Sequence, residues 1–320
     1  MESCRALVTG GAGFIGSHLA EKLLEEGNRI IIVDNLSSGR TQNIEPLMDN
    51  PSLTFLKEDL KKPVHMDSAV KESDIIFHFA ANPDVRIGDT EPRTHYEENV
   101  LATFNLLEAI RKAGKPKTIV FASTSTVYGE ATEIPTPEHY GPLVPISTYG
   151  ASKLSCEALI MSYAHTFSHE ALILRLANIV GPRSTHGVIA DFVRKLRANP
   201  SELEILGDGT QEKSYMHVED CVGATLHLTA RLLSNSRRIE VYNIGSEDAI
   251  SVVKIAEIVA QAMDTRNVKY TFTGGIDGGR GWRGDVRKMR LSVDKLIRTG
   301  WKPKYGSEQA VRLSVQALVK

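Results

Sequence analysis

Two side chains with the chemistry of a base and its activating cation lie four residues apart, in the segment Tyr149-Gly150-Ala151-Ser152-Lys153. On a helix, residues i and i+4 share one face, so the phenol and the ammonium lie one turn apart. A free tyrosine has a pKa of about 10, and a neighbouring cation favours its phenolate. Reaching neutrality requires about 3 pKa units, or ~4 kcal/mol. On its own, such a pair also fits the solvated surface of a helix.

A glycine-rich segment upstream favours a catalytic role for this pair over a place on the helix surface. Gly10, Gly13 and Gly16, spaced Gly-x-x-Gly-x-x-Gly, follow the first predicted strand and open the first predicted helix. Glycines there let the backbone turn tightly and approach a pyrophosphate, whose charge meets the helix N-terminus. Asp34 closes the next strand, where a carboxylate accepts hydrogen bonds from ribose hydroxyls and repels the extra phosphate of NADP. The pattern predicts NAD binding; the alternative is a strand–helix turn that binds nothing.

Hydroxyl side chains end another predicted strand, which leads into Ser123-Thr124-Ser125-Thr126. In an open α/β sheet, ligands bind outside the carboxyl ends of the strands, so these hydroxyls are expected to face the cofactor. A hydroxyl beside Tyr149 can hydrogen-bond a reacting alcohol and relay its proton. Runs of serine and threonine also form turns, and both roles fit different members of this run.

The elements that must position these groups alternate between strands and helices. Apolar runs predict strands over 5–9, 30–33, 53–57, 74–80, 117–123 and 171–176, and helical spacing predicts helices over 14–24, 95–113 and 148–169. This alternation is typical of an α/β fold, a doubly wound parallel sheet with helices on both faces.

Beyond residue 178 the pattern loosens. It predicts a helix near 218–234, a strand near 239–244, and helices near 251–263 and 307–319. We expect a Rossmann-type NAD-binding domain over 1–177, to which elements from about 215–247 return. We expect residues 178–214 and 248–320 to form a smaller mixed α/β domain that binds the substrate.

Composition excludes several other classes of protein. The 320 residues include 38 basic and 39 acidic side chains, a formal net charge of −1 that gives no reason to expect nucleic acid or an anionic membrane as partner. No apolar run reaches the ~18–20 residues of a membrane helix, and the first strand leaves no room for a signal peptide. Three distant cysteines lack metal-ligand spacing and indicate reduced thiols in a cytoplasmic protein without a metal site.

Taken together, TGGAGFIGSH, VDNLSSG, HFAAN, ENVLATFNLLEA, STVYG and YGASK resemble the extended short-chain dehydrogenase/reductase superfamily. Within it, the chain is similar to the UDP-glucose 4-epimerase group of the NAD-dependent epimerase/dehydratase family. The resemblance runs from Arg5 to the last predicted helix, and its N-terminal motifs are the more specific ones. It implies an NAD-dependent enzyme that inverts C4 of a UDP-hexose through a transient 4-keto sugar.

The resemblance also implies the site residues. The catalytic positions are Thr124, Tyr149 and Lys153. The cofactor-binding positions are Gly10, Gly13, Phe14, Ile15, Gly16, Asp34, Asn35, Ser37, Ser38, Gly39, Asp59, Leu60, Phe79, Ala80, Ala81, Asn99, Ser123, Tyr149 and Lys153. The substrate-binding positions are Thr124, Ser125, Tyr149, Asn178, Val188, Leu206, Lys213, Arg280, Asp285 and Met289.

Some substrate positions depart from the family pattern. Lys213 stands where many relatives carry arginine, so the positive charge near phosphate is kept but the planar bidentate fork is lost. In GRGWRGD, Arg280 or Arg283 supplies a second phosphate contact, and we prefer Arg280. Met289 maps onto the bulky gatekeeper of strict glucose/galactose enzymes. Because methionine is flexible, we expect UDP-N-acetylglucosamine to be accepted as well as UDP-glucose.

Other functions of the same fold require different residues at these positions. A sugar 4,6-dehydratase carries an Asp-Glu pair after the catalytic threonine, where this chain has Ser125-Thr126. A UDP-uronate epimerase or decarboxylase stays open, because one basic side chain near the hexose would change the preference. A cofactor-sensing regulator typically lacks the Tyr/Lys pair that this chain retains. Family habit implies a homodimer through the helices near 95–113 and 148–169, in a four-helix contact.

Overall fold

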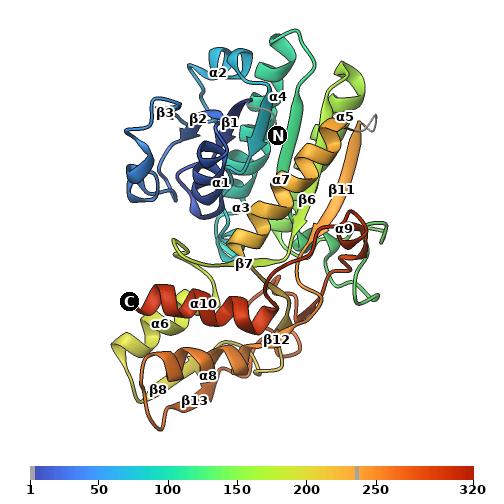
Figure 1. Cartoon of the computed structure of the whole chain (residues 1–320). Coiled ribbons are helices and arrows are strands. Elements are labelled where there is room, and N and C mark those ends of the chain that lie inside the picture. Colours follow the sequence, from blue (N-terminus) through green and yellow to red (C-terminus); the bar gives the residue numbers. More distant parts are fainter. Residues whose placement is uncertain (1–3, 235–237) are drawn as a thin grey trace.

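The computed structural model describes residues 4–234 and 238–320, and its centre is a parallel sheet (Figure 1). Seven strands lie in the order β11-β6-β5-β4-β1-β2-β3, and each neighbouring pair is parallel. The strands are β1 (Arg5–Thr9), β2 (Arg29–Asp34), β3 (Leu53–Lys57), β4 (Ile75–His78), β5 (Thr118–Thr124), β6 (Glu170–Leu176) and β11 (Ile239–Ile244). The chain winds away from β1 in both directions, which confirms the predicted doubly wound α/β fold. The ligand crevice of such a sheet lies where β1 and β4 end.

Helices cover both faces of the sheet. They are α1 (Phe14–Glu25), α2 (Met66–Glu72), α4 (Ala102–Lys112), α5 (Thr148–Phe167) and α7 (Val218–Ser234). Because side chains alternate along a strand, Ala6 and Val8 of β1 belong to the apolar core that α1 and α7 share, whereas Leu7 belongs to the core under α2, α4 and α5. Burial on both faces explains why the strand sequences are apolar almost throughout.

The single helix predicted over 95–113 is instead built from three pieces. The short helix α3 (Pro92–His95) leads into a π-helical stretch, η4 (Tyr96–Leu101), which leads into α4. The predicted helix is therefore present over this range, although the wider i→i+5 turns of η4 interrupt its α-helical geometry. The helix predicted over 148–169 ends at Phe167, since Ser168 takes a left-handed conformation with φ 58°.

A second apolar core lies beyond the sheet. Besides α7 and β11, the elements after β6 are β7 (Asn178–Val180), α6 (Val188–Ala198), β8 (Glu202–Ile205), β9 (Glu212–Lys213), β10 (Tyr215–His217), β12 (Ile250–Ser251), α8 (Val252–Ala262), β13 (Lys269–Phe272), β14 (Lys288–Met289), α9 (Asp294–Ile297) and α10 (Ser307–Val319). Of these, α9 packs against β11, with Leu296 in the core that α1 and α7 share. Phe192 of α6, Ile255 of α8 and Val311 of α10 share one buried cluster. Figure 1 shows these three helices below the sheet, while α7 and β11 return to it.

Short 3-10 turns lie in the connections: η1 (Thr41–Asn43), η2 (Glu45–Leu47), η3 (Val85–Asp89) and η5 (Ser125–Tyr128). Within residues 4–234 and 238–320, no helix combines the length and apolarity needed to cross a bilayer. The same residues contain no group of three or more His, Cys, Asp or Glu arranged to hold a metal ion. Cys4, Cys156 and Cys221 are free thiols.

Candidate active site

In the turn between β1 and α1, the backbone approaches its neighbours too closely for side chains. Gly10 has a φ of +71°, and a Cβ there would lie 2.6 Å from the backbone nitrogen of Ala80. A Cβ on Gly16 would collide with the carbonyl of Gly10. Gly13 is the N-cap of α1 and has no side chain to bond the first N–H groups of the helix. The turn is therefore open to an anion at the helix N-terminus, which fits a pyrophosphate.

Asp34 ties this turn to the loop that follows β2. One carboxylate oxygen accepts a hydrogen bond from the Ala12 N–H (3.0 Å), and the other accepts from the Leu36 N–H (2.8 Å). Burial raises the pKa of Asp34, against the lowering effect of these two bonds. Gly39 passes so near that a Cβ would lie 2.7 Å from Asp34 Oδ1. The carboxylate therefore organises the pocket rim and keeps lone pairs for ribose hydroxyls.

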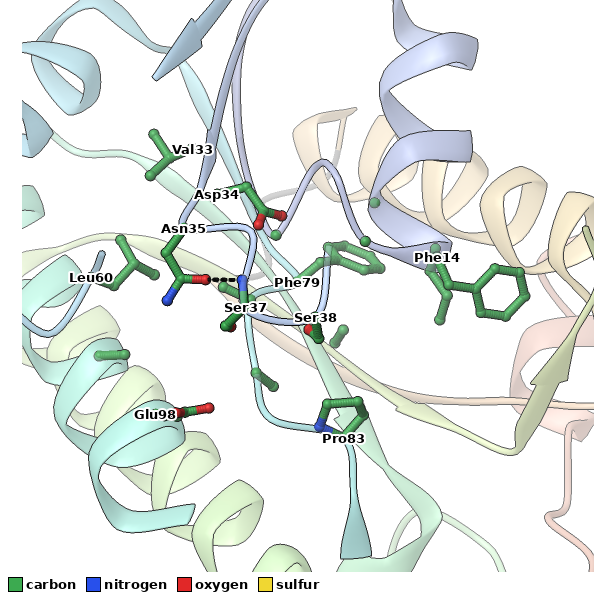
Figure 2. Close-up of a pocket in the computed structure, with 18 of the residues that line it drawn as sticks. Phe14, Val33, Asp34, Asn35, Ser37, Ser38, Leu60, Phe79, Pro83 and Glu98 are labelled. Atoms are coloured by element: carbon green, nitrogen blue, oxygen red, sulfur yellow. Dashed lines mark hydrogen bonds between the residues drawn. The ribbon is translucent and has the colours of Figure 1, made fainter. Parts of the chain in front are cut away.

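The pocket beside the glycine turn contains most of the predicted cofactor positions. In Figure 2, Asp34 ends β2, Asn35, Ser37 and Ser38 follow it in the loop, and Phe79 lies between this loop and Phe14. Predicted residues that line it are Gly10, Gly13, Phe14, Ile15, Gly16, Asp34, Asn35, Ser37, Ser38, Asp59, Leu60, Phe79, Ala80, Ala81, Ser123, Tyr149 and Lys153. Gly39 and Asn99 lie outside the lining.

The sequence did not single out the segment that closes one side of this pocket. Arg183, Thr185 and His186 follow β7 and line the pocket, although they are far from the glycine turn in sequence. Arg183 donates to the carboxylate of Glu21 in α1 at 2.7 Å and to the hydroxyl of Ser17 at 3.3 Å. These bonds hold the segment against α1. The run GPRSTHG was visible in the sequence, but only the tertiary packing places it here.

Tyr149 and Lys153 line the same pocket from the first two turns of α5. The helix starts here because the Ser147 hydroxyl accepts a hydrogen bond from the Gly150 N–H (3.0 Å), as an N-cap does. Burial raises the pKa of Tyr149 to about 12, while a hydrogen bond with Thr124 lowers it. Burial lowers the pKa of Lys153 to about 8, because the charged ammonium loses its hydration.

The surroundings of these two side chains are largely aromatic and hydroxylic. The Lys153 ammonium lies 4.2 Å from the ring centroid of Phe121, within the range of a cation–π contact. Thr124 ends β5, and its Oγ1 accepts from the Thr126 N–H at 3.2 Å and lies 3.1 Å from the Thr126 hydroxyl. The three predicted catalytic side chains therefore lie together at the carboxyl edge of the sheet. A phenol, a hydroxyl and a cation in this arrangement can exchange a proton with a bound alcohol.

Ser123 lines the pocket, but its hydroxyl points to a buried ion pair. It donates to Glu157, which also pairs with Arg175 of β6 (2.8 Å). Both partners are buried, with side-chain exposures of 0% for Glu157 and 6% for Arg175. Sequence reasoning missed this pair, although Glu157 follows Lys153 by one helical turn. The pair fixes α5 to the sheet directly behind the catalytic side chains.

Asn99 acts through the backbone of the loop that follows β4. Its carbonyl oxygen accepts from the Asn82 N–H (2.8 Å), and its amide donates to the Ser152 hydroxyl (2.9 Å). Ser152 donates in turn to the Tyr149 carbonyl at 2.7 Å. Asn99 thus connects the loop after β4 to the catalytic helix, and it does not itself line the pocket.

The predicted diphosphate cations are paired with carboxylates. Lys213 at the end of β9 bonds Asp285 at 2.6 Å, and Asp285 is buried. Arg280 donates to the Asp285 carbonyl (2.8 Å) and to Glu130 (2.6 Å), whereas Arg283 is exposed. Lys213, Arg280 and Asp285 therefore form one cluster.

The remaining substrate positions lie outside the pocket lining. Met289 of β14 is the direct register partner of Lys213. Asn178 opens β7 and donates to the Ser214 carbonyl (3.1 Å). Ser125 opens η5, Val188 opens α6, and Leu206 follows β8.

Comparison with known proteins gives the family. The model of the "NAD dependent epimerase/dehydratase family" matches residues 6–245. The putative UDP-glucose 4-epimerase of Methanocaldococcus jannaschii is 32% identical over 96% of this chain and 95% of its own. A crystal structure of a UDP-galactose 4-epimerase is 44% identical, covers 98% of each chain and has a TM-score of 0.85. Matches also include UDP-glucuronic acid decarboxylases.

One further solved structure bears on the cofactor. The UDP-glucuronic acid 4-epimerase of Bacillus cereus, in complex with UDP-glucuronic acid and NAD, is 26% identical, covers 98% of each chain and has a TM-score of 0.86. The side-chain-free glycine turn and the Asp34 carboxylate are the features that NAD requires here. The chain described here therefore belongs to the NAD-dependent epimerase/dehydratase family of nucleotide-sugar enzymes, with NAD as its cofactor.

Proposed function

We propose that this enzyme is a 4-epimerase of UDP-hexoses, with UDP-glucose and UDP-galactose as its substrate pair. The observation that carries the proposal is that Tyr149 and Lys153 line the NAD pocket, while the Thr124 hydroxyl is hydrogen-bonded to Tyr149. Relatives named as UDP-glucose and UDP-galactose 4-epimerases support it over almost the whole chain.

In this reaction Tyr149 removes the proton of the sugar 4-OH, and Lys153 stabilises the phenolate by its charge. Thr124 holds the 4-oxygen and relays the proton. NAD, when bound, supplies reversible hydride acceptance, which converts C4 to a ketone and back. Tyr149 returns the proton once the ketone has presented its other face. The configuration at C4 is thereby inverted.

The hexose must turn over while the rest of the substrate stays bound. We propose that Lys213 and Arg280 hold the diphosphate with Asn178, and that Val188 and Leu206 contact the uridine. Binding energy drawn from UDP leaves the hexose weakly held, as such a rotation requires. Asp285 pairs with Lys213 in the described structure, so the diphosphate exchanges places with a carboxylate or adds to the pair.

We also propose that UDP-N-acetylhexoses are accepted, because flexible Met289 lies beside Lys213 and can vacate space for an acetamido group. Met289→Tyr is expected to lower turnover of UDP-N-acetylglucosamine and to leave UDP-glucose turnover largely intact. Equal turnover of the acetylated sugar by both proteins would contradict this role. Met289→Leu, similar in volume, is the matched control.

A second candidate is a UDP-uronate epimerase or decarboxylase. Its support is that relatives include a UDP-glucuronic acid 4-epimerase and UDP-glucuronic acid decarboxylases. An exposed cation, Arg283, also lies between Arg280 and Asp285 in the sequence. The dehydratase function lacks its acid and base, since Ser125-Thr126 follows Thr124.

For the organisation of the chain, we propose that residues 1–177 with about 215–247 bind NAD, and that 178–214 with 248–320 bind the substrate. We further propose a homodimer through η4, α4 and α5. The exposed aromatic side chains there are Tyr96, Phe104 and Phe167, at 58%, 41% and 39% exposure. Light scattering tests the dimer: a monomer at micromolar concentration, with activity intact, would contradict it.

The decisive experiment for the reaction is a panel of UDP-sugars incubated with the purified protein, with products identified by NMR. UDP-galactose formed from UDP-glucose supports the proposal. Conversion of UDP-glucuronic acid alone, to its C4 epimer or to a pentose, favours the second candidate. Bound NAD without conversion of any sugar would instead support a regulatory protein.

A further inference from the structure

His95 packs directly against the proposed base. It ends α3 with 1% exposure, and its ring centroid lies 5.6 Å from that of Tyr149, with the ring planes at 60°. This is an edge-on aromatic contact at ordinary distance. The mechanism above does not use His95, and neither the glycine turn nor the diphosphate cluster contains it.

The hydrogen bonds of His95 define its tautomer. Nε2 lies 3.0 Å from the backbone carbonyl of Asp84, which can only accept, so Nε2 carries the proton. Nδ1, 2.8 Å from the Thr148 hydroxyl, then accepts from it. Burial lowers the pKa of His95, in keeping with a neutral ring. Both nitrogens are therefore occupied in the uncharged form.

These two partners belong to different walls of the active site. Asp84 lies in the loop after β4, next to Pro83 of the pocket lining. Thr148 is the first residue of α5 and immediately precedes Tyr149. The segment that contains Gly88 packs tightly against the start of α5, since a Cβ on Gly88 would collide with the Thr148 hydroxyl. His95 thus bridges the cofactor-side loop and the start of the catalytic helix.

A parallel bridge lies one turn along the same segment. Asn99 joins Asn82 of the loop to Ser152 of α5. Thr148 and Ser152 flank Tyr149 at positions i−1 and i+3, so the two bridges hold the helix on either side of the phenol. The His95 bridge also contacts the Tyr149 ring.

We propose that His95 is a positioning residue for Tyr149, whose neutral ring fixes the phenol between Thr124 and the cofactor by tethering Thr148 to the Asp84 carbonyl. This inference rests on the proposed function in that Tyr149 is taken as the base. It adds a residue that sets the orientation of the base without touching the substrate.

The Thr148 side of the bridge gives the cleanest test, because Thr148 is exposed and its replacement leaves the core intact. Thr148→Val keeps the shape and removes the hydroxyl, and Thr148→Ser keeps the hydroxyl as the matched control. We expect kcat of the valine variant to fall about fivefold, the equivalent of one hydrogen bond. KM, bound NAD and melting temperature are expected to match those of the serine variant.

Substitutions of His95 separate the two bonds. Asparagine reproduces the acceptor at Nδ1, and glutamine reproduces the donor at Nε2. We expect His95→Asn to retain more kcat than His95→Ala, and to lose that advantage when Thr148 is valine. Equal kcat in Thr148→Val and Thr148→Ser would overturn the proposal, as would a fall in kcat matched by an equal loss of bound NAD.

A structural readout keeps this test separate from that of the reaction. In crystals of the NAD-loaded proteins, we expect Tyr149 to leave its contact with His95 in Thr148→Val and to keep it in Thr148→Ser. Identical tyrosine positions in both would overturn the positioning role. Failure of the wild type to convert any UDP-sugar would defeat the proposed function, while the crystal comparison would still decide the role of His95.

Discussion

Replacing Lys153 by methionine tests whether its ammonium makes Tyr149 a base. Burial puts the pKa of Tyr149 at about 12, so ionisation at neutral pH requires a lowering by about 5 pKa units, or about 7 kcal/mol. A unit charge one helical turn away, at roughly 5–6 Å and an effective dielectric constant of about 20, contributes about 3 kcal/mol of this. The positive ring of the bound cofactor is expected to contribute much of the remainder.

Without the ammonium, the pKa of Tyr149 rises by about 2 units and the phenolate fraction near pH 7 falls about 100-fold. We expect kcat of Lys153→Met to fall by the same factor and to keep rising with pH after the wild-type rate has levelled off. Burial lowers the pKa of Lys153 to about 8, so the wild-type ammonium is present near neutral pH. Because the phenolate in turn stabilises the ammonium, the wild-type rate is expected to level off once Tyr149 is ionised, and the rate of the methionine variant is expected to approach it at alkaline pH.

The assay is kcat against pH at saturating UDP-glucose, expressed per molecule of bound NAD. Lys153→Arg is the matched variant: it keeps a charge that does not titrate in this range, so its kcat near pH 7 is expected to exceed that of Lys153→Met. A methionine variant within about threefold of wild type near pH 7, less than 1 kcal/mol in the barrier, would refute the electrostatic role. Superimposable pH profiles of the methionine and arginine variants would also refute it.

Three further outcomes are expected. Tyr149→Phe is expected to retain NAD and to lose about 10²–10⁴-fold in kcat at every pH, because the shape stays and the proton acceptor is gone; near-full turnover would remove the proposed base. Asp34→Ala is expected to weaken NAD binding by about tenfold or more and to reduce the preference for NAD over NADP. Calorimetry on protein stripped of cofactor measures both affinities, and an unchanged ratio of NAD affinity to NADP affinity would contradict the role of Asp34. Glu157→Gln leaves a buried guanidinium unpaired and is expected to lower the free energy of unfolding by about 3–5 kcal/mol in denaturant melts, whereas Glu25→Gln, in an exposed pair, is expected to change it little.

Local sequence signals predict much of this fold. Apolar runs of strand length and the glycine turn lead directly to the doubly wound sheet, because both depend on residues adjacent in the chain. The Tyr149–Lys153 pair is visible for the same reason, since helix geometry brings i and i+4 together. The π-helical stretch after His95 is invisible to such reasoning, because its side-chain spacing still resembles that of a regular helix.

What the sequence missed depends on contacts between distant segments. His95 and Thr148 are separated by more than fifty residues, and nothing in the residues around either one indicates that they meet. The burial of Tyr149 also depends on contacts between distant segments, so the sequence alone does not reveal it. From the sequence, Tyr149 needs about 3 pKa units to ionise at neutral pH, whereas the structure raises that requirement to about 5 because the surrounding protein excludes water from the phenol.

The two halves of the proposed site differ in rigidity, and the reaction requires that difference. Around Tyr149 the polar groups are short, buried and bonded at both ends, as in the bridge through Asn99 to Ser152. On the sugar side the groups are long side chains in ion pairs, such as Lys213 with Asp285. Inversion at C4 needs a fixed base and a substrate whose hexose can turn. A rigid hydrogen-bonded wall opposite exchangeable charges meets both requirements, and tightening the second half would be expected to slow epimerisation even if it strengthened binding.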